Sequence, residues 1–316
     1  KKAISKKGSM KEIAITEQAK SVSSIPQRVL GKTGELVPIL GLGTGPGGLG
    51  MKDDAAIALY LRAIERGITY FDTAPGYDRA HAQLSEILPA HRSGLFVASK
   101  AFTADRDEAL RIVDQSLRDL HIDKLDLVYV HCVGNFDPEQ VVAKSGSLAG
   151  LREAQKRGLT RFVGITAHHM PRRAAEILTH ADIDVCMFAL NPGDRHTYNF
   201  EEEVLPLARK QNTGIAAMKV FGGAKEMKYE LEKGERERPT AMATHGFTDY
   251  DHAFRYALNL PGVSINVIGM YTEEELERNI GYALNHQPLE ALDLLTLDSI
   301  GADLGRNWGE HFGPAR

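Results

Sequence analysis

Four side chains that can hold or move a proton follow successive apolar segments of the chain. Asp72 lies late in "TYFDTA" (69–74), and Tyr77 comes just after it, beyond a Pro-Gly turn. Lys100 ends "LFVASK" (95–100), and His131 stands near the end of "LDLVYVHC" (125–132). The types of these residues point to acid–base chemistry on a small substrate.

A phenol has an unperturbed pKa of about 10, so it is a poor acid at neutral pH unless a nearby ammonium stabilises the phenolate. Tyr77 beside Lys100 would be a tunable proton donor, and Asp72 would supply the counter-charge that a buried lysine needs. His131 would hydrogen-bond the substrate oxygen that Tyr77 protonates. The set contains no evident nucleophile, so the reaction would need an external reductant such as a nicotinamide hydride.

Eight short apolar segments, separated by amphipathic stretches, are the elements that would position these groups. Such a pattern predicts a closed (β/α)8 TIM barrel with its helices outside, whose strand ends form one active rim. A doubly wound open sheet is the alternative, but "GLGTGPGGLG" lacks the following helix register and acid of a dinucleotide fingerprint. The expected strands lie at 38–44, 69–74, 95–100, 125–132, 161–167, 185–190, 214–220 and 265–270.

Composition limits the possible partners. The chain has 316 residues, 43% of them apolar, and a net charge of -4 from 38 basic and 42 acidic side chains. There is no basic excess for nucleic acid and no apolar run of about 18 residues for a membrane span, so a small-molecule partner is expected. The two cysteines lie inside apolar runs, which suits a reducing compartment such as the cytoplasm.

The first 25 residues are rich in Lys and Ser and lack apolar periodicity, so we expect a flexible tail there and one barrel domain over 26–316. The tail shows no apolar signal segment, and export with a signal already trimmed stays open. Residues 28–40, "RVLGKTGELVPIL", predict a β-hairpin before the first barrel strand.

The motifs resemble those of the aldo-keto reductases. "GLGT", "FDTAPGY", "ASK", "VYVH", "GLTRFVGITA" and "VIGMYTEEELERNI" occur in order over roughly residues 27–285. The resemblance implies a barrel whose bottom is closed by the hairpin, and reversible reduction of an aldehyde or ketone by NAD(P)H. It also implies a catalytic tetrad of Asp72, Tyr77, Lys100 and His131, with Tyr77 as the general acid.

The same resemblance implies a site for NAD(H) or NADP(H), although several positions depart from the family. Thr166 and Ala167 stand where a Ser-Asn pair is common, and Met187 stands in place of the usual Gln. The residues assigned to the cofactor by motif position are Gly43, Thr44, Thr166, Asn191, Met218, Lys219, Gly269, Thr272, Glu275 and Asn279.

The basic residue that usually binds a 2'-phosphate is missing, because Met270 and Glu275 occupy the places where Arg or Lys are common. An acid there would repel a 2'-phosphate and could accept hydrogen bonds from a free ribose diol, which favours NADH over NADPH. The other reading is that Glu275 is an ordinary solvated charge of a helix.

Loops would select the substrate. Residues 221–248 are long for a connection and would either fold over the cofactor or the mouth, or form a disordered insertion. Asp194, Arg195 and His196 are polar enough to favour a sugar-like or polyhydroxylated carbonyl.

Two rival functions stay open. A metal-dependent barrel hydrolase could use Asp72, His131, His168 and His169, but the His-x-His spacing of such enzymes is absent from the first strand. A barrel that binds a nicotinamide cofactor without catalysis, as a regulatory or partner subunit, is the other. An intact tetrad argues against it.

Overall fold

The computed structural model describes residues 24–316, so the predicted flexible tail falls almost entirely outside the described residues. Eight parallel strands form a closed barrel in the order β10-β3-β4-β5-β6-β7-β8-β9. The open-sheet alternative is therefore wrong, because β10 pairs with both β3 and β9. The strands are β3 (Leu40–Gly43), β4 (Tyr70–Asp72), β5 (Phe96–Ala101), β6 (Leu125–Val130), β7 (Thr160–Ala167), β8 (Val185–Ala189), β9 (Gly214–Met218) and β10 (Val263–Gly269).

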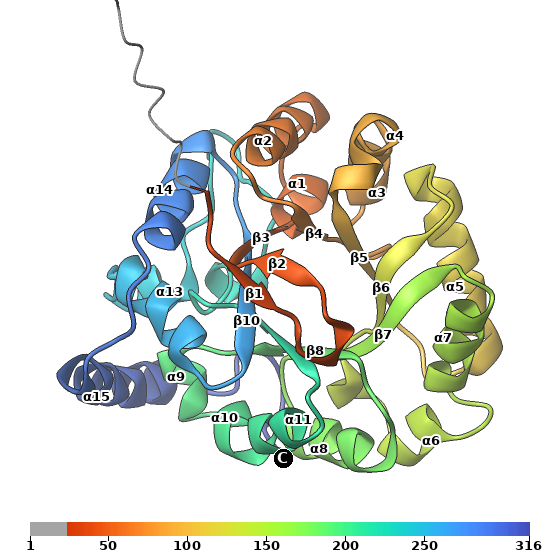
Figure 1. Ribbon diagram of the computed structural model, residues 1–316. Coiled ribbons are helices and arrows are strands. Elements are labelled where there is room, and N and C mark those ends of the chain that lie inside the picture. The colour runs from red at the N-terminus through yellow and green to blue at the C-terminus, as the bar shows by residue number, and fades with distance from the viewer. Residues whose placement is uncertain (1–23) are drawn as a thin grey trace, which may run out of the picture.

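The predicted hairpin is confirmed and lies across one end of the barrel, where β1 and β2 cross in front of the strands (Figure 1). β1 (Gln27–Val29) and β2 (Leu36–Pro38) pair antiparallel around a single 3-10 turn, Gly31–Thr33. Gly34 ends that turn at φ 73°, a left-handed conformation that glycine adopts without steric cost.

Helices surround the barrel on all sides in Figure 1, as a parallel sheet with buried strands requires. Their bounds are α1 (Gly45–Leu49), α2 (Asp53–Glu65), α3 (Ala80–Ser85), α4 (Leu88–His91), α5 (Arg106–Leu120), α6 (Pro138–Val142), α7 (Ser147–Lys156), α8 (Pro171–His180), α9 (Pro192–Arg195), α10 (Phe200–Glu203), α11 (Leu205–Lys210), α12 (Ala241–Thr244), α13 (Tyr250–Asn259), α14 (Glu273–Leu284) and α15 (Ala291–Trp308).

Helix α5 illustrates how the local sequence determines where a helix begins, where it ends and which face it buries. Its N-cap Asp105 accepts a hydrogen bond from the Glu108 amide at 2.9 Å, and His121 ends the helix in the left-handed conformation. Between these caps the apolar residues recur every three or four positions, and this face is buried against the barrel. The buried apolar residues are Ala109, Val113, Leu117 and Leu120.

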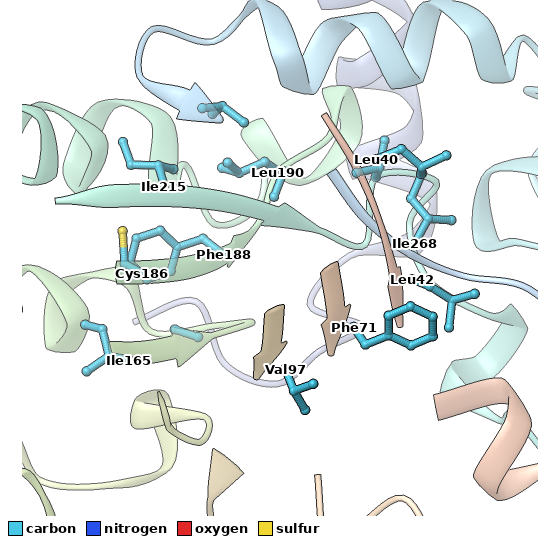
Figure 2. Packing of buried hydrophobic residues seen from close by; sticks show 14 of the residues in the cluster. Leu40, Leu42, Phe71, Val97, Ile165, Cys186, Phe188, Leu190, Ile215 and Ile268 are labelled. Carbon is cyan, nitrogen blue, oxygen red and sulfur yellow. The ribbon is translucent and has the colours of Figure 1, made fainter. Parts of the chain in front are cut away.

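The core has two layers because side chains alternate along each strand. Outward-facing residues such as Leu42, Phe71 and Val97 pack between the strands and the helices, and Figure 2 shows them on neighbouring strands. The second layer fills the barrel itself, where the rings of Tyr70 and Phe96 stack with centroids 4.9 Å apart. Within residues 24–316, no helix combines the length and the apolar character that a membrane crossing needs.

Candidate active site

Strand alternation places three of the predicted residues at the mouth of the barrel. Tyr70, Ala98 and Tyr129 belong to the interior layer. Asp72, Lys100 and His131 each come two residues later on β4, β5 and after β6, so their side chains continue the same inward rows. Parallel strands end on one rim, so these groups meet there.

Asp72 and Lys100 form a buried ion pair. The Lys100 Nζ donates to Asp72 Oδ2 at 2.6 Å and to the carbonyl of Thr73 at 2.8 Å, and the two side chains are 5% and 1% exposed. Burial raises the pKa of Asp72, while the adjacent ammonium acts to lower it. The pair holds Lys100 in one position beneath the mouth.

Tyr77 reaches the same mouth on the turn after β4. Its amide donates to the carbonyl of Ala74 at 3.0 Å, which closes the Pro-Gly turn. Lys100 Nζ lies 4.7 Å from the centre of the Tyr77 ring, and the ring meets that of His131 edge-on at 6.2 Å. The structure therefore brings Asp72, Tyr77, Lys100 and His131 together as predicted, and their catalytic roles stay predictions.

A glycine allows this turn to pack closely. A Cβ added to Gly48 of α1 would lie 1.9 Å from the carbonyl oxygen of Tyr77, a separation that real side chains do not reach. Only glycine fits there, so part of the glycine-rich run supports the Tyr77 turn. Close packing therefore accounts for a glycine in this run, and no dinucleotide-binding fingerprint is needed to explain it.

The charge that acts on the Tyr77 phenol differs from the one expected. Burial raises the pKa of Tyr77 well above 10, with Asp72 adding to the rise, and the charge that opposes it is that of Lys219. Lys100 forms its salt bridge with Asp72, at 2.6 Å. Tyr77 thus stays protonated at neutral pH and can donate.

His131 is neutral at the mouth. Burial, followed by the charges of Lys100 and Lys219, lowers the pKa of His131 to about 3. A neutral imidazole keeps one N–H donor and one acceptor at every pH in the physiological range. It can therefore donate a hydrogen bond to a substrate oxygen without carrying charge.

A cavity runs from Tyr77 toward the start of α14, and half of the residues assigned to the cofactor line it. Those are Gly43, Met218, Lys219, Gly269 and Glu275. Glu275 is no ordinary solvated charge, since its side chain is 14% exposed and its Oε2 accepts from the Tyr271 amide at 2.7 Å. Burial raises the pKa of this carboxyl.

The other assigned residues do not line this cavity. Thr44 Oγ1 donates to the carbonyl of Asp72 at 3.0 Å, and Thr166 Oγ1 accepts from the Cys132 amide at 2.9 Å. Asn191 caps α9 and donates to the carbonyl of Lys219 at 2.9 Å. Thr272 caps α14, where its hydroxyl accepts from the Glu275 amide. Asn279 is buried. Their assignment to the cofactor stays a prediction.

The segment after β9 covers the cavity. We call residues 221–240 the strap. An isolated bridge between Ala224 and Thr240 closes its base. Tyr229 from its middle accepts a hydrogen bond from Lys219 through its hydroxyl and another from Tyr271 through its carbonyl, the latter at 2.9 Å.

Several residues that line this cavity lie at positions that the motifs did not assign to the cofactor. His168, Tyr229, Arg238 and Tyr271 are among them. The length of segment 221–248 was the signal for Tyr229 and Arg238, but nothing in its composition showed which residues point inward. His168 lies with its Nδ1 3.3 Å from Cys132 Sγ, beside the mouth.

The polar residues expected to favour a sugar have structural partners. Buried Asp194 accepts from Asn191 Nδ2 at 2.6 Å and lies 2.8 Å from Nε2 of His311, which fixes the C-terminal segment. Arg195 pairs with Glu201 at 3.1 Å and also with Glu202 and Asp298, and His196 Nε2 lies 3.1 Å from the same Asp298. Within residues 24–316, no three His, Cys, Asp or Glu side chains gather closely enough to hold a metal ion.

The structure thus combines a closed parallel barrel, four ionisable side chains at its mouth and a cavity beside them. The family comparison agrees: a model of the aldo/keto reductase family matches residues 39–302. The chain therefore belongs to the aldo/keto reductase family, and it is an NAD(P)H-dependent oxidoreductase.

Individual relatives are distant. The chain is 23% identical to L-galactose dehydrogenase of Arabidopsis thaliana, over 90% of this chain and 95% of that protein. It is 25% identical to pyridoxal 4-dehydrogenase of Microbacterium luteolum, over 80% and 92%. A solved aldo-keto reductase from Bombyx mori, in complex with NADP, shares the fold with a TM-score of 0.67 at 19% identity, over 89% of this chain and 94% of that one.

The family uses nicotinamide cofactors. One buried oxygen atom that lines the cavity fits such a group, since Asp72 Oδ1 has no hydrogen-bond partner among the described residues. An amide or hydroxyl donor of a dinucleotide would satisfy this oxygen at the Tyr77 end of the cavity. Asn279 Oδ1 on α14 also lacks such a partner, but Asn279 does not line the cavity.

Proposed function

We propose that the protein reversibly reduces an aldehyde or ketone to an alcohol, with Tyr77 as the general acid assisted by Lys100, Asp72 and His131. The observation that carries the proposal is the meeting of the four groups at one mouth: the Tyr77 ring lies 4.7 Å from Lys100 Nζ and edge-on to His131. The cavity beside them supplies room for the reductant.

The residues would act in fixed roles. A bound NAD(P)H supplies the hydride that the carbonyl carbon accepts. The Tyr77 hydroxyl gives its proton to the carbonyl oxygen, and the positive charges of Lys219 and Lys100 stabilise the phenolate that remains. Neutral His131 donates a hydrogen bond to the same oxygen while negative charge develops on it. In the reverse direction the phenolate takes the alcohol proton.

Asp72 would act through Lys100. The carboxylate holds the ammonium by a 2.6 Å hydrogen bond, so the lysine keeps one position under the Tyr77 ring. Because the ammonium is already fixed, it does not have to reorganise when the phenolate forms. Its charge therefore stabilises the phenolate effectively.

For the substrate we propose a small hydroxylated carbonyl, such as a sugar or its derivative. The support is the likeness over nearly the whole chain to a plant protein named L-galactose dehydrogenase. The polar run at Asp194 no longer adds support, since its side chains are engaged in the fold. The two cysteines are free thiols, which fits a reducing compartment such as the cytoplasm.

A panel of substrates tests both the proposed reaction and the proposed substrate class. NADH and NADPH oxidation is followed at saturating cofactor with hexose and pentose aldehydes, short aliphatic aldehydes and bulky apolar ketones. Turnover of any carbonyl supports the reaction, and a preference for the hydroxylated aldehydes supports the substrate class. Activity confined to apolar ketones would reject the substrate class alone. Cofactor binding without any turnover would favour a non-catalytic binding subunit.

A further inference from the structure

A lysine ammonium without a carboxylate partner faces the Tyr77 end of the cavity. Lys219 directly follows β9 and lines the cavity with Tyr77 and Asp72. Among residues 24–316, its side chain makes one hydrogen bond, from Nζ to the Tyr229 hydroxyl. Asp72 already pairs with Lys100 at 2.6 Å. The Tyr77 end of the cavity therefore carries one positive charge that forms no salt bridge within the described chain.

The backbone turns Lys219 toward this cavity. Ala216 and Met218 belong to the layer inside the barrel, so plain alternation would direct Lys219 outward. Lys219 instead adopts the left-handed conformation, with φ 56°, which is uncommon for a residue with a side chain. Its carbonyl accepts from Asn191 Nδ2 at 2.9 Å and from the Gly222 amide at 2.7 Å. Strain that the surrounding structure fixes in this way is typical of functional positions.

The charge of Lys219 acts on the groups around the proposed carbonyl site. Burial raises the pKa of Tyr77, and Lys219 opposes that rise. Burial lowers the pKa of His131 and that of His168, and Lys219 adds to both shifts. Both imidazoles are therefore neutral at physiological pH, and neither supplies a counter-charge. The ammonium thus lies beside the groups that a carbonyl substrate would meet, away from the α14 end of the cavity.

Lys219 and Tyr229 together offer several donors to one ligand. An ammonium has three N–H donors, and the bond to Tyr229 uses one of them. The Tyr229 hydroxyl accepts that bond and has no other partner among the described residues, so its own proton is free to be donated. The Tyr229 carbonyl accepts from the Tyr271 hydroxyl at 2.9 Å, which holds the strap over the cavity. Donors of this kind suit an oxyanion, because one of them carries charge.

We propose that Lys219 and Tyr229 bind a carboxylate of the substrate, so that the protein selects aldehydes or ketones that also carry an acid group. This rests on the proposed function, because it names the substrate class of the same site. The carboxylate would give the ammonium the partner that the described chain does not supply. Among sugar derivatives, the uronic acids have this chemistry. A cofactor phosphate is the other source of an oxyanion, and titration with the cofactor alone separates the two.

The test is steady-state reduction of matched substrates that differ in charge. Succinate semialdehyde is compared with pentanal, and D-glucuronate with D-glucose, in wild type, Lys219→Met and Lys228→Met. The quantity read is kcat/KM for the charged member divided by kcat/KM for the neutral member. A ratio is needed because Lys219 also stabilises the Tyr77 phenolate, so its loss would slow both reactions. Lys228 is the matched control, because it lies on the same strap and is 65% exposed.

We expect a wild-type ratio of about ten or more, and a fall in that ratio of about tenfold or more in Lys219→Met, the loss of one charge-assisted contact. The fall should lie mainly in KM, because the carboxylate is bound in the ground state as well as in the transition state. Lys228→Met should leave the ratio within about twofold. If Lys219→Met fails to fold, Tyr229→Phe keeps the ammonium and should lower the ratio by about threefold.

The outcomes separate the alternatives. A high wild-type ratio that falls in the variant supports the proposal. A wild type that reduces both members of each pair equally well would overturn it and leave the proposed reaction intact. A ratio retained in folded Lys219→Met, or in Tyr229→Phe, would overturn it too, and a raised Kd for NADPH in Lys219→Met would then assign the lysine to the cofactor. A wild type that reduces none of the four carbonyls would reject the proposed function and this proposal with it.

Discussion

The Asp72–Lys100 pair makes the sharpest prediction, because both groups are buried and 2.6 Å apart. Lys100→Met leaves a buried carboxylate without its partner, and such a break costs about 3–5 kcal/mol of unfolding free energy. Asp72→Asn in turn leaves the buried ammonium without its partner charge, and it should lower the free energy of unfolding by a similar amount. The double variant removes both charges, so its loss should fall below the sum of the single losses by about 2–3 kcal/mol.

The loss in Lys100→Met should depend on pH with a defined sign. Burial already raises the pKa of Asp72, and removal of Lys100 takes away its main lowering influence. A carboxyl whose folded pKa exceeds its unfolded value of about 3.9 stabilises the fold below that value, and this stability is lost as pH rises through the folded pKa. The deficit of Lys100→Met relative to wild type should therefore be larger at pH 8 than at pH 5.

Urea unfolding followed by circular dichroism, at both pH values, measures these losses. The control is Lys156→Met, an exposed lysine at the end of α7, which should change stability by less than about 0.5 kcal/mol. A Lys100→Met loss below about 1 kcal/mol, or a strictly additive double variant, would refute the buried-pair argument.

Three further predictions follow from the same geometry. Burial lowers the pKa of His131 to about 3, so kcat/KM should show no inflection from this group between about pH 5 and 8, and an inflection lost in His131→Gln would contradict this. Cys132 is partly exposed beside His168 whereas Cys186 is fully buried, and burial raises the pKa of the Cys132 thiol to about 11, so N-ethylmaleimide should modify native Cys132 only slowly at pH 7 and Cys186 only after denaturation, as read by peptide mass mapping. Gly48→Ala would force a contact with the Tyr77 carbonyl, so kcat should fall while Gly281→Ala, which meets nothing within 4 Å, leaves activity unchanged.

The barrel could be predicted from the sequence because two simple patterns indicate its strands and helices. Each strand is a short apolar run, and each is followed by a segment with a period of three to four residues. The strand ends then placed Asp72, Lys100 and His131 on one rim, since alternation along a parallel strand is fixed by geometry. All eight strands and the hairpin are confirmed.

The cavity was harder to predict, because it depends on which of several partners a polar side chain meets. Thr44 and Asn191 occupy motif positions, yet their side chains bond to the protein's own backbone and do not line the cavity. Arg238 lies in a segment without periodicity, and only the fold of the strap turns it inward. Such placements follow from tertiary packing, which local patterns do not encode.

The central claim is that Tyr77 delivers the proton in carbonyl reduction. The most direct test compares wild type with Tyr77→Phe in cofactor titration and in steady-state reduction of the best aldehyde from the panel. We predict an unchanged cofactor Kd and a fall in kcat/KM of about 10²–10⁴-fold, the usual contribution of a general acid. A Tyr77→Phe variant that retains the wild-type kcat/KM would contradict it.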